Sequence, residues 1–186
     1  MLGGRVKTLH PAIHAGILAR EIPSDMADLE KQGYAPIKMV VCNLYPFQET
    51  VSRVGTTLQD AIEQIDIGGV TLIRAAAKNF FHVAAVSDPD DYDTIIAMLE
   101  KNGEIDLAMK QALAVKAFAH TRDYDTAIHA FLSRGTTTMM QVVIDQLPEQ
   151  ISLGVRKTEE LRYGENPHQQ AAYYNRQMEG PLGGKI

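Results

Sequence analysis

The sequence predicts an α/β fold in which helices cover both faces of a parallel sheet, followed by the start of a second α/β domain. Helical segments alternate with two short apolar runs, 37–42 and 83–86, whose β-branched residues are typical of buried strands. The composition then shifts at Gly135-Thr136-Thr137-Thr138. We therefore expect a first domain over residues 1–134, a linker over 135–150 and the beginning of a second domain over 151–186.

Capping residues predict the helices of the first half of this domain. Proline at the first helical position favours a short helix over 11–20. Ser24 is a candidate N-cap for a second helix, which ends at Gly33. Thr57-Leu58-Gln59-Asp60 resembles a capping box and starts a helix that ends at Ile65.

Four further helices and two strands complete the expected elements. We expect a helix over 70–79 and a helix that Asp88-Pro89 caps and that ends at Asn102-Gly103. The segment 107–134 is helical throughout, and we expect a break near Thr121-Arg122-Asp123 that divides it into two helices. In the second domain, strands are expected over 151–156 and 171–174.

Composition places the chain among ordinary globular proteins and excludes several functions. Of 186 residues, 45% are hydrophobic and 22% charged, and the net charge of −5 argues against broad nucleic-acid binding. The single cysteine, Cys42, excludes an intrachain disulfide framework and fits the reducing cytosol. No apolar run is long enough to span a bilayer, and no signal-peptide pattern opens the chain. We therefore expect a cytoplasmic protein with no nucleic-acid or membrane partner.

The first residues carry a candidate anion site. Arg5 and Lys7 are two positions apart, so in an extended segment both side chains point to the same side and can face one phosphate. A solvated basic loop is the alternative. His10 and His14 have the spacing of paired metal ligands, but no glutamate stands beside His10, so a helix-start histidine and a packed one are favoured over a metal site.

Three more segments offer groups for proton transfer. Asn43 and Tyr45 follow the first strand, and Asp66 precedes two glycines at a helix start, where backbone N–H groups favour negative charge. Asp66 as a plain helix cap is the alternative, as is Lys78 as a complement to the helix dipole. Together, Lys7, Tyr45, Asp66 and Lys78 suit acid–base chemistry on a phosphorylated small molecule.

Five motifs occur in an order that is far more specific than any one of them. They are Arg5-Val-Lys-Thr-Leu-His-Pro, Asn43-Leu-Tyr-Pro-Phe, Ile65-Asp-Ile-Gly-Gly, Arg74-Ala-Ala-Ala-Lys-Asn and Leu161-Arg-Tyr-Gly-Glu-Asn-Pro-His-Gln. The set closely resembles the bifunctional AICAR transformylase/IMP cyclohydrolase family over essentially the whole chain. The resemblance implies that residues 1–134 form a methylglyoxal-synthase-like three-layer α/β/α domain. It also implies a homodimer.

The resemblance also implies the chemistry and the role of each matched residue. The cyclohydrolase closes formyl-AICAR to IMP with loss of water and needs no cofactor, and the transformylase uses 10-formyltetrahydrofolate as co-substrate. By motif match, Lys7, Tyr45, Asp66 and Lys78 are catalytic. Six other residues would bind substrates: Arg5, Thr8, Asn43 and Gly68 in the cyclohydrolase domain, and Arg162 and Tyr163 in the transformylase domain.

Two departures from the family pattern set the expectation that this chain is a fragment. Members carry a segment ahead of the position of Met1 with the first strands and with phosphate-binding loops, and its absence explains why only two strands are expected here. The main body of the transformylase domain is also missing. A non-catalytic nucleotide-binding module and an inert fragment are therefore the alternatives to an active cyclohydrolase.

Overall fold

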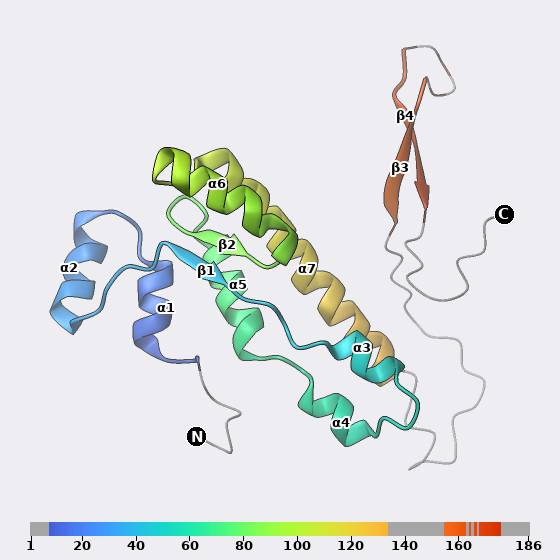
Figure 1. Ribbon diagram of the computed structural model, residues 1–186, viewed down its shortest axis with the longest axis horizontal. Helices are drawn as coiled ribbons and strands as arrows, with labels where there is room; N and C mark the ends of the chain where they lie inside the picture. The colour runs from blue at the N-terminus through green and yellow to red at the C-terminus, as the bar shows by residue number, and fades with distance from the viewer. Residues whose placement is uncertain (1–7, 134–154, 163, 165, 167, 176–186) are drawn as a thin grey trace. The chain divides into compact units, whose positions relative to one another are not determined.

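The computed structural model describes residues 8–133, 155–162, 164, 166 and 168–175 (Figure 1). The chain divides into two compact units, Met1–Met139 and Met140–Ile186. No helix in the described part of the chain is long and apolar enough to cross a membrane.

A two-stranded parallel sheet lies at the centre of the described part of the first unit. Strand β1 (Met39–Val41) pairs with β2 (Ala84–Val86) in the register Met39↔Ala84 and Val41↔Val86. This confirms both strands and their parallel pairing. The expectation that both are buried is wrong for β1, because Met39 and Val41 are exposed, whereas all of β2 is buried.

Helices cover both faces of β2, as the sequence predicts. Val83 and Ala85 belong to one apolar cluster with Ile73 of helix α5 (Gly68–Lys78). Ala84 and Val86 belong to another with Ile95 of helix α6 (Tyr92–Asn102). Successive residues of a strand point to opposite faces, so one strand separates the two clusters. Helix α7 (Leu107–Ser133) contributes to both through Ala114 and Leu113.

The first helices begin and end close to the expected positions. Helix α1 (Pro11–Leu18) starts with its proline, and the Nδ1 atom of His10 accepts a hydrogen bond from the Ala12 N–H at 3.2 Å. Helix α2 (Pro23–Gln32) ends at Gly33, whose φ of 68° is left-handed, as expected of a glycine C-cap. Ser24 as its N-cap is wrong, because Pro23 already takes the first helical position and Ile22 precedes it.

For the remaining helices, one predicted cap is confirmed and one predicted helix break is wrong. Helix α4 (Leu58–Glu63) starts at the capping box of Thr57 and Asp60. Helix α7 is a single helix of 27 residues, so the break near Thr121 is wrong. Thr121 is buried, and its hydroxyl donates to the Phe118 carbonyl at 3.2 Å, so the helix accommodates the polar residue. Two short elements complete the unit: α3 (Phe47–Ser52) and the 3₁₀ turn η2 (Pro89–Asp91).

The described part of the second unit is a β-hairpin. Strands β3 (Arg156–Leu161) and β4 (Ala171–Asn175) pair antiparallel with a register shift between Lys157 and Glu159. The strand expected over 171–174 is therefore confirmed. The one expected over 151–156 lies mostly outside the described residues, and β3 begins where that prediction ends.

Candidate functional site

The amino-terminal end of α5 meets the segment that precedes α1. Gly68 is the first residue of α5, and a Cβ atom built on it would overlap the Oγ1 atom of Thr8. A larger residue at this position would therefore force the threonine side chain to move. Thr8 and Gly68, both expected to bind substrate, are therefore in direct contact.

Asp66 is held beside the same helix end by hydrogen bonds at both its side chain and its backbone. Its Oδ1 atom accepts a hydrogen bond from the Gly69 N–H at 2.7 Å, and its own N–H donates to the Tyr124 hydroxyl at 2.9 Å. The residue is 9% exposed. The prediction that Asp66 caps the helix is confirmed, because its side chain accepts a helix N–H. Its second carboxylate oxygen, Oδ2, lies against Gly69.

The carboxyl end of β1 reaches this place from the other side. A Cβ atom at Gly69 would lie 3.0 Å from the Cδ2 atom of Leu44, which stands between Asn43 and Tyr45. Burial and the charge of Asp66 raise the pKa of the Cys42 thiol, which places the strand end near that carboxylate. Asn43 and Tyr45 are exposed.

Lys78 lies at the opposite end of α5. It is the last residue of the helix, ten positions after Gly68, and a rise of about 1.5 Å per residue separates the two by about 15 Å. Its neighbour Asn79 is buried, and its side-chain amide donates to the carbonyls of Ile17 at 2.8 Å and Ala19 at 2.9 Å. Within one chain, Lys78 therefore does not meet Asp66.

The structure thus brings Thr8, Asp66 and Gly68 together at the start of α5, and Leu44, which stands between Asn43 and Tyr45, reaches the same place. Arg5, Lys7 and Tyr163 lie outside the described residues, and Arg162 is exposed on the hairpin of the second unit. Sequence reasoning missed Tyr124, because no local pattern links it to a residue 58 positions earlier.

Comparisons with known proteins place the chain in a family. The model described as "AICARFT/IMPCHase bienzyme" matches residues 76–184, and the model described as "MGS-like domain" matches residues 1–71. The chain belongs to the AICARFT/IMPCHase bienzyme family. The two matches confirm the resemblance and the methylglyoxal-synthase-like fold class that the five motifs predicted.

Individual relatives agree with this assignment. The chain is 52% identical over 175 residues to "Bifunctional purine biosynthesis protein PurH" of Thermosynechococcus vestitus, covering 94% of this chain and 33% of that protein. It is 49% identical over 176 residues to the protein of the same name from Cyanothece sp., with the same coverages. The chain therefore spans about one third of the length of these relatives.

A solved structure shares the fold. The crystal structure of ForH superposes with a TM-score of 0.65 at 39% sequence identity, covering 72% of this chain and 69% of that chain. This match supports the α/β architecture described above.

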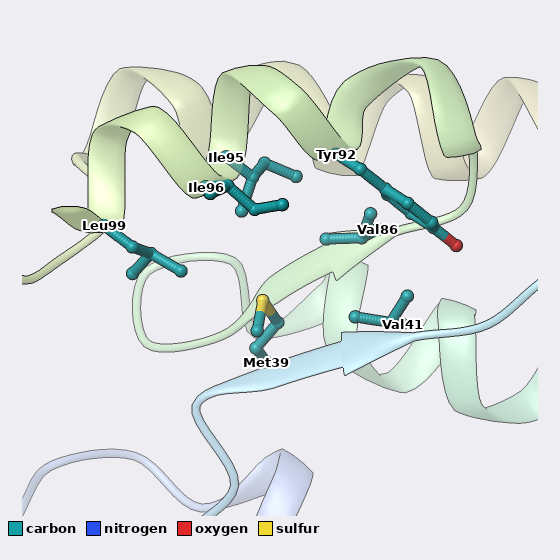
Figure 2. A pocket seen from close by; sticks show the side chains of 7 residues that line it. All are labelled: Met39, Val41, Val86, Tyr92, Ile95, Ile96 and Leu99. Atoms are coloured by element: carbon teal, nitrogen blue, oxygen red, sulfur yellow. The ribbon is translucent and has the colours of Figure 1, made fainter.

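The structure also contains an apolar groove that none of the expected site residues lines. Figure 2 shows this groove between the sheet and α6, into which Met39 and Val41 of β1 point from one side and Ile95 and Ile96 from the other. In the described ranges, no group of three or more histidine, cysteine, aspartate or glutamate side chains could hold a metal ion.

The chemistry available at the α5 end follows from its parts. The first N–H groups of an α-helix have no partner within the helix and carry partial positive charge, so they favour an anionic ligand. Beside them stand a carboxylate at Asp66 and a hydroxyl at Thr8, and the segment with the Asn43 amide and the Tyr45 phenol reaches the same helix end through Leu44. The set combines anion binding with groups that accept and donate protons.

Proposed function

We propose that this chain carries the IMP cyclohydrolase site of a bifunctional purine-biosynthesis enzyme. The reaction closes formyl-AICAR to IMP: the carboxamide nitrogen attacks the formyl carbon, the carbonyl oxygen becomes an oxyanion, and water leaves. The observation that carries the proposal is the meeting of Thr8, Asp66 and Gly68 at the start of α5, in a chain of this family.

Each residue is proposed for a role that its chemistry, or its place in the family motif, supports. Thr8, Asn43 and Gly68, with Arg5, hold the nucleotide, and the α5 amino-terminal end favours its negative charge. Asp66 and Tyr45 transfer protons to and from the reacting nitrogen and oxygen. Lys7 stabilises the developing oxyanion. No cofactor is required, because forming the C–N bond and losing water change no oxidation state and need only proton transfers to assist them.

Lys78 needs a separate account. It completes the motif that begins at Arg74, yet it lies about one helix length from Asp66 in its own chain. We therefore place Lys78 in the site of a second copy of the chain, in a cytosolic homodimer. Its charge would there stabilise the oxyanion or relay a proton.

The hairpin unit is proposed to open the transformylase domain. Arg162 and Tyr163 would help to bind AICAR, which the whole enzyme formylates with 10-formyltetrahydrofolate. The described chain contains only the two strands around this motif, so the transformylase reaction is proposed for the longer protein.

The test is ring closure of formyl-AICAR by the purified chain, followed by ultraviolet absorbance. Formation of IMP above the uncatalysed rate supports the proposal, and Asp66→Asn should remove most of the gain while leaving a measurable residual rate. If no IMP forms while calorimetry detects IMP binding, the chain is a nucleotide-binding module. If neither activity nor binding is detected, both ligand-directed functions are wrong for this chain.

A further inference from the structure

The hydroxyl of Tyr124 bridges the loop that carries Asp66. It donates a hydrogen bond to the Gln64 carbonyl at 2.7 Å and accepts one from the Asp66 N–H at 2.9 Å. Both partners belong to the turn between α4 and α5, whereas Tyr124 lies on α7. One phenol therefore fixes this turn from a helix 58 residues further along the chain.

The bridge is rigid because the ring that carries it is buried. Tyr124 is 7% exposed and makes an edge contact with Phe47, at 6.2 Å between ring centroids. Phe47 in turn makes an edge contact with Phe131, at 5.7 Å. The ring thus has little freedom, and the position of its oxygen is set by the packing of α3 against α7.

The hydroxyl keeps its proton in this environment. Burial, the largest cause, raises the pKa of Tyr124, the hydrogen bond from the Asp66 N–H lowers it by less, and the charges of Asp66 and Asp125 raise it again. A neutral phenol both donates and accepts, which is what the two bonds require. The bridge is therefore intact at neutral pH.

We infer that Tyr124 is a positioning residue for Asp66, holding its backbone so that its carboxylate stays bonded to Gly69 at the ligand-binding end of α5. Two hydrogen bonds thus act in series: Tyr124 fixes the Asp66 backbone, and Gly69 fixes its side chain. This inference rests on the proposed function for its effect on catalysis, although the positioning itself is independent of it.

The first experiment separates positioning from packing by its effect on kinetics. Tyr124→Phe keeps the ring and removes only the hydroxyl, and we expect kcat for ring closure to fall about tenfold with KM changed less than about twofold. Phe131→Leu is the matched control, because it loosens the same aromatic cluster without touching the bridge. It should lower stability and leave kcat near the starting value. Equal kcat losses in the two variants would overturn the inference.

A double mutant tests whether Tyr124 acts through Asp66. In an Asp66→Asn background, Tyr124→Phe should lower the remaining kcat by less than about twofold, because residues that act as one unit are not additive. A full tenfold loss in that background would contradict the inference, since Tyr124 would then act independently of the carboxylate.

A third measurement does not depend on activity. Tyr124→Phe should speed amide hydrogen exchange at Asp66 and Gly69 at least about tenfold more than Phe131→Leu does. If the unmodified chain produces no IMP, the proposed function fails, but this exchange result still supports or overturns the positioning role. Unchanged protection at both amides would overturn it.

Discussion

The two ends of helix α5 differ. Its amino-terminal end has two glycines beside Thr8 and the Asp66 carboxylate, which accepts a helix N–H, whereas its carboxyl-terminal end is followed by the buried Asn79. At the first end, the N–H that bonds to the Asp66 carboxylate belongs to Gly69. The second end satisfies the carbonyls at the end of α1, which have no partner within that helix. One helix therefore joins a candidate ligand site to an anchor that holds the fold.

This difference divides a single motif into two kinds of residue. In Arg74-Ala-Ala-Ala-Lys-Asn, the three alanines and Asn79 are buried, and the alanines let α5 lie close to the sheet and to α7. Arg74 and Lys78 are exposed, with the Arg74 guanidinium 5.4 Å from the centre of the Phe118 ring. A linear motif can thus be shared between stability and chemistry.

Replacement of Lys78 gives the largest expected effect on activity. Lys78→Ala should slow ring closure by about a hundredfold, as expected for a group that assists proton transfer or charge stabilisation. Nucleotide affinity should change much less, and the free energy of unfolding by under about 0.5 kcal/mol, because the side chain is exposed. Steady-state kinetics, calorimetry with IMP and urea unfolding provide the three measurements.

A mixing experiment tests whether Lys78 serves a second copy. Lys78→Ala and Asp66→Asn chains, each almost inactive alone, are unfolded together and refolded in equal amounts. About a quarter of the activity of the unmodified dimer should return, because half of the dimers then contain one intact site of their two. Absence of recovery, with mixed dimers demonstrated, would show that Lys78 acts within its own chain or not at all.

Asn79 should show the opposite behaviour to its neighbour. Asn79→Ala removes two buried hydrogen bonds and leaves two carbonyls unsatisfied, and we expect a loss of about 2–3 kcal/mol in the free energy of unfolding. IMP affinity, measured at a temperature where the variant is folded, should be unchanged. A stability loss as small as that of Lys78→Ala would contradict the anchoring role.

Local patterns in the sequence predict several helix ends and one strand correctly. Capping boxes, glycine C-caps and apolar runs are local signals, and they locate Thr57, Gly33 and β2 correctly. The rule that ligands bind at the carboxyl ends of parallel strands predicts that Asn43 belongs to the site, and this stays a prediction. The local predictions are confirmed because each depends on a few neighbouring residues.

Long-range features of the site do not follow from local patterns. The polar run at Thr121-Arg122-Asp123 indicated a break in α7, yet burial of Thr121 keeps the helix continuous and so carries Tyr124 to Asp66. The separation of Lys78 from Asp66 follows simply from helix rise and needs no structure. What the sequence lacked was the direction of α5 relative to the sheet.

Gly69→Ala tests the geometry of the ligand-binding end. The new Cβ atom would lie 2.6 Å from Asp66 Oδ2, so the carboxylate must move and lose its bond to the helix. That loss outweighs the better helix propensity of alanine, and we expect a net destabilisation of about 1 kcal/mol, measured by urea unfolding, together with slower ring closure. In an Asp66→Ala background the conflict with the carboxylate disappears and only the tight approach to Leu44 Cδ2 remains, so the same substitution should destabilise the chain less.

The smallest effect is expected at an ion pair that touches neither end of α5. The Lys116 Nζ atom lies 2.7 Å from Asp88 Oδ2 and 2.9 Å from Asp91 Oδ2, joining α7 to the turn before α6. The hydrogen bond between Lys116 and Asp88 lowers the pKa of Asp88 and raises the pKa of Lys116. Because the pair is partly exposed, Lys116→Met should cost less than about 1 kcal/mol at neutral pH.

The pH dependence of that cost identifies its source. A lowered carboxyl pKa adds stability that is present above the unfolded value of about 4 and is lost as pH falls through the folded one. A raised lysine pKa adds stability that is present below about 10.4 and is lost as pH rises further. Urea unfolding should therefore show a difference between Lys116→Met and the unmodified chain that is constant from about pH 5 to 9 and shrinks toward pH 3. A difference that persists unchanged at pH 3 would mean that the lysine stem, through its packing on α7, and not its charge, stabilises this part of the fold.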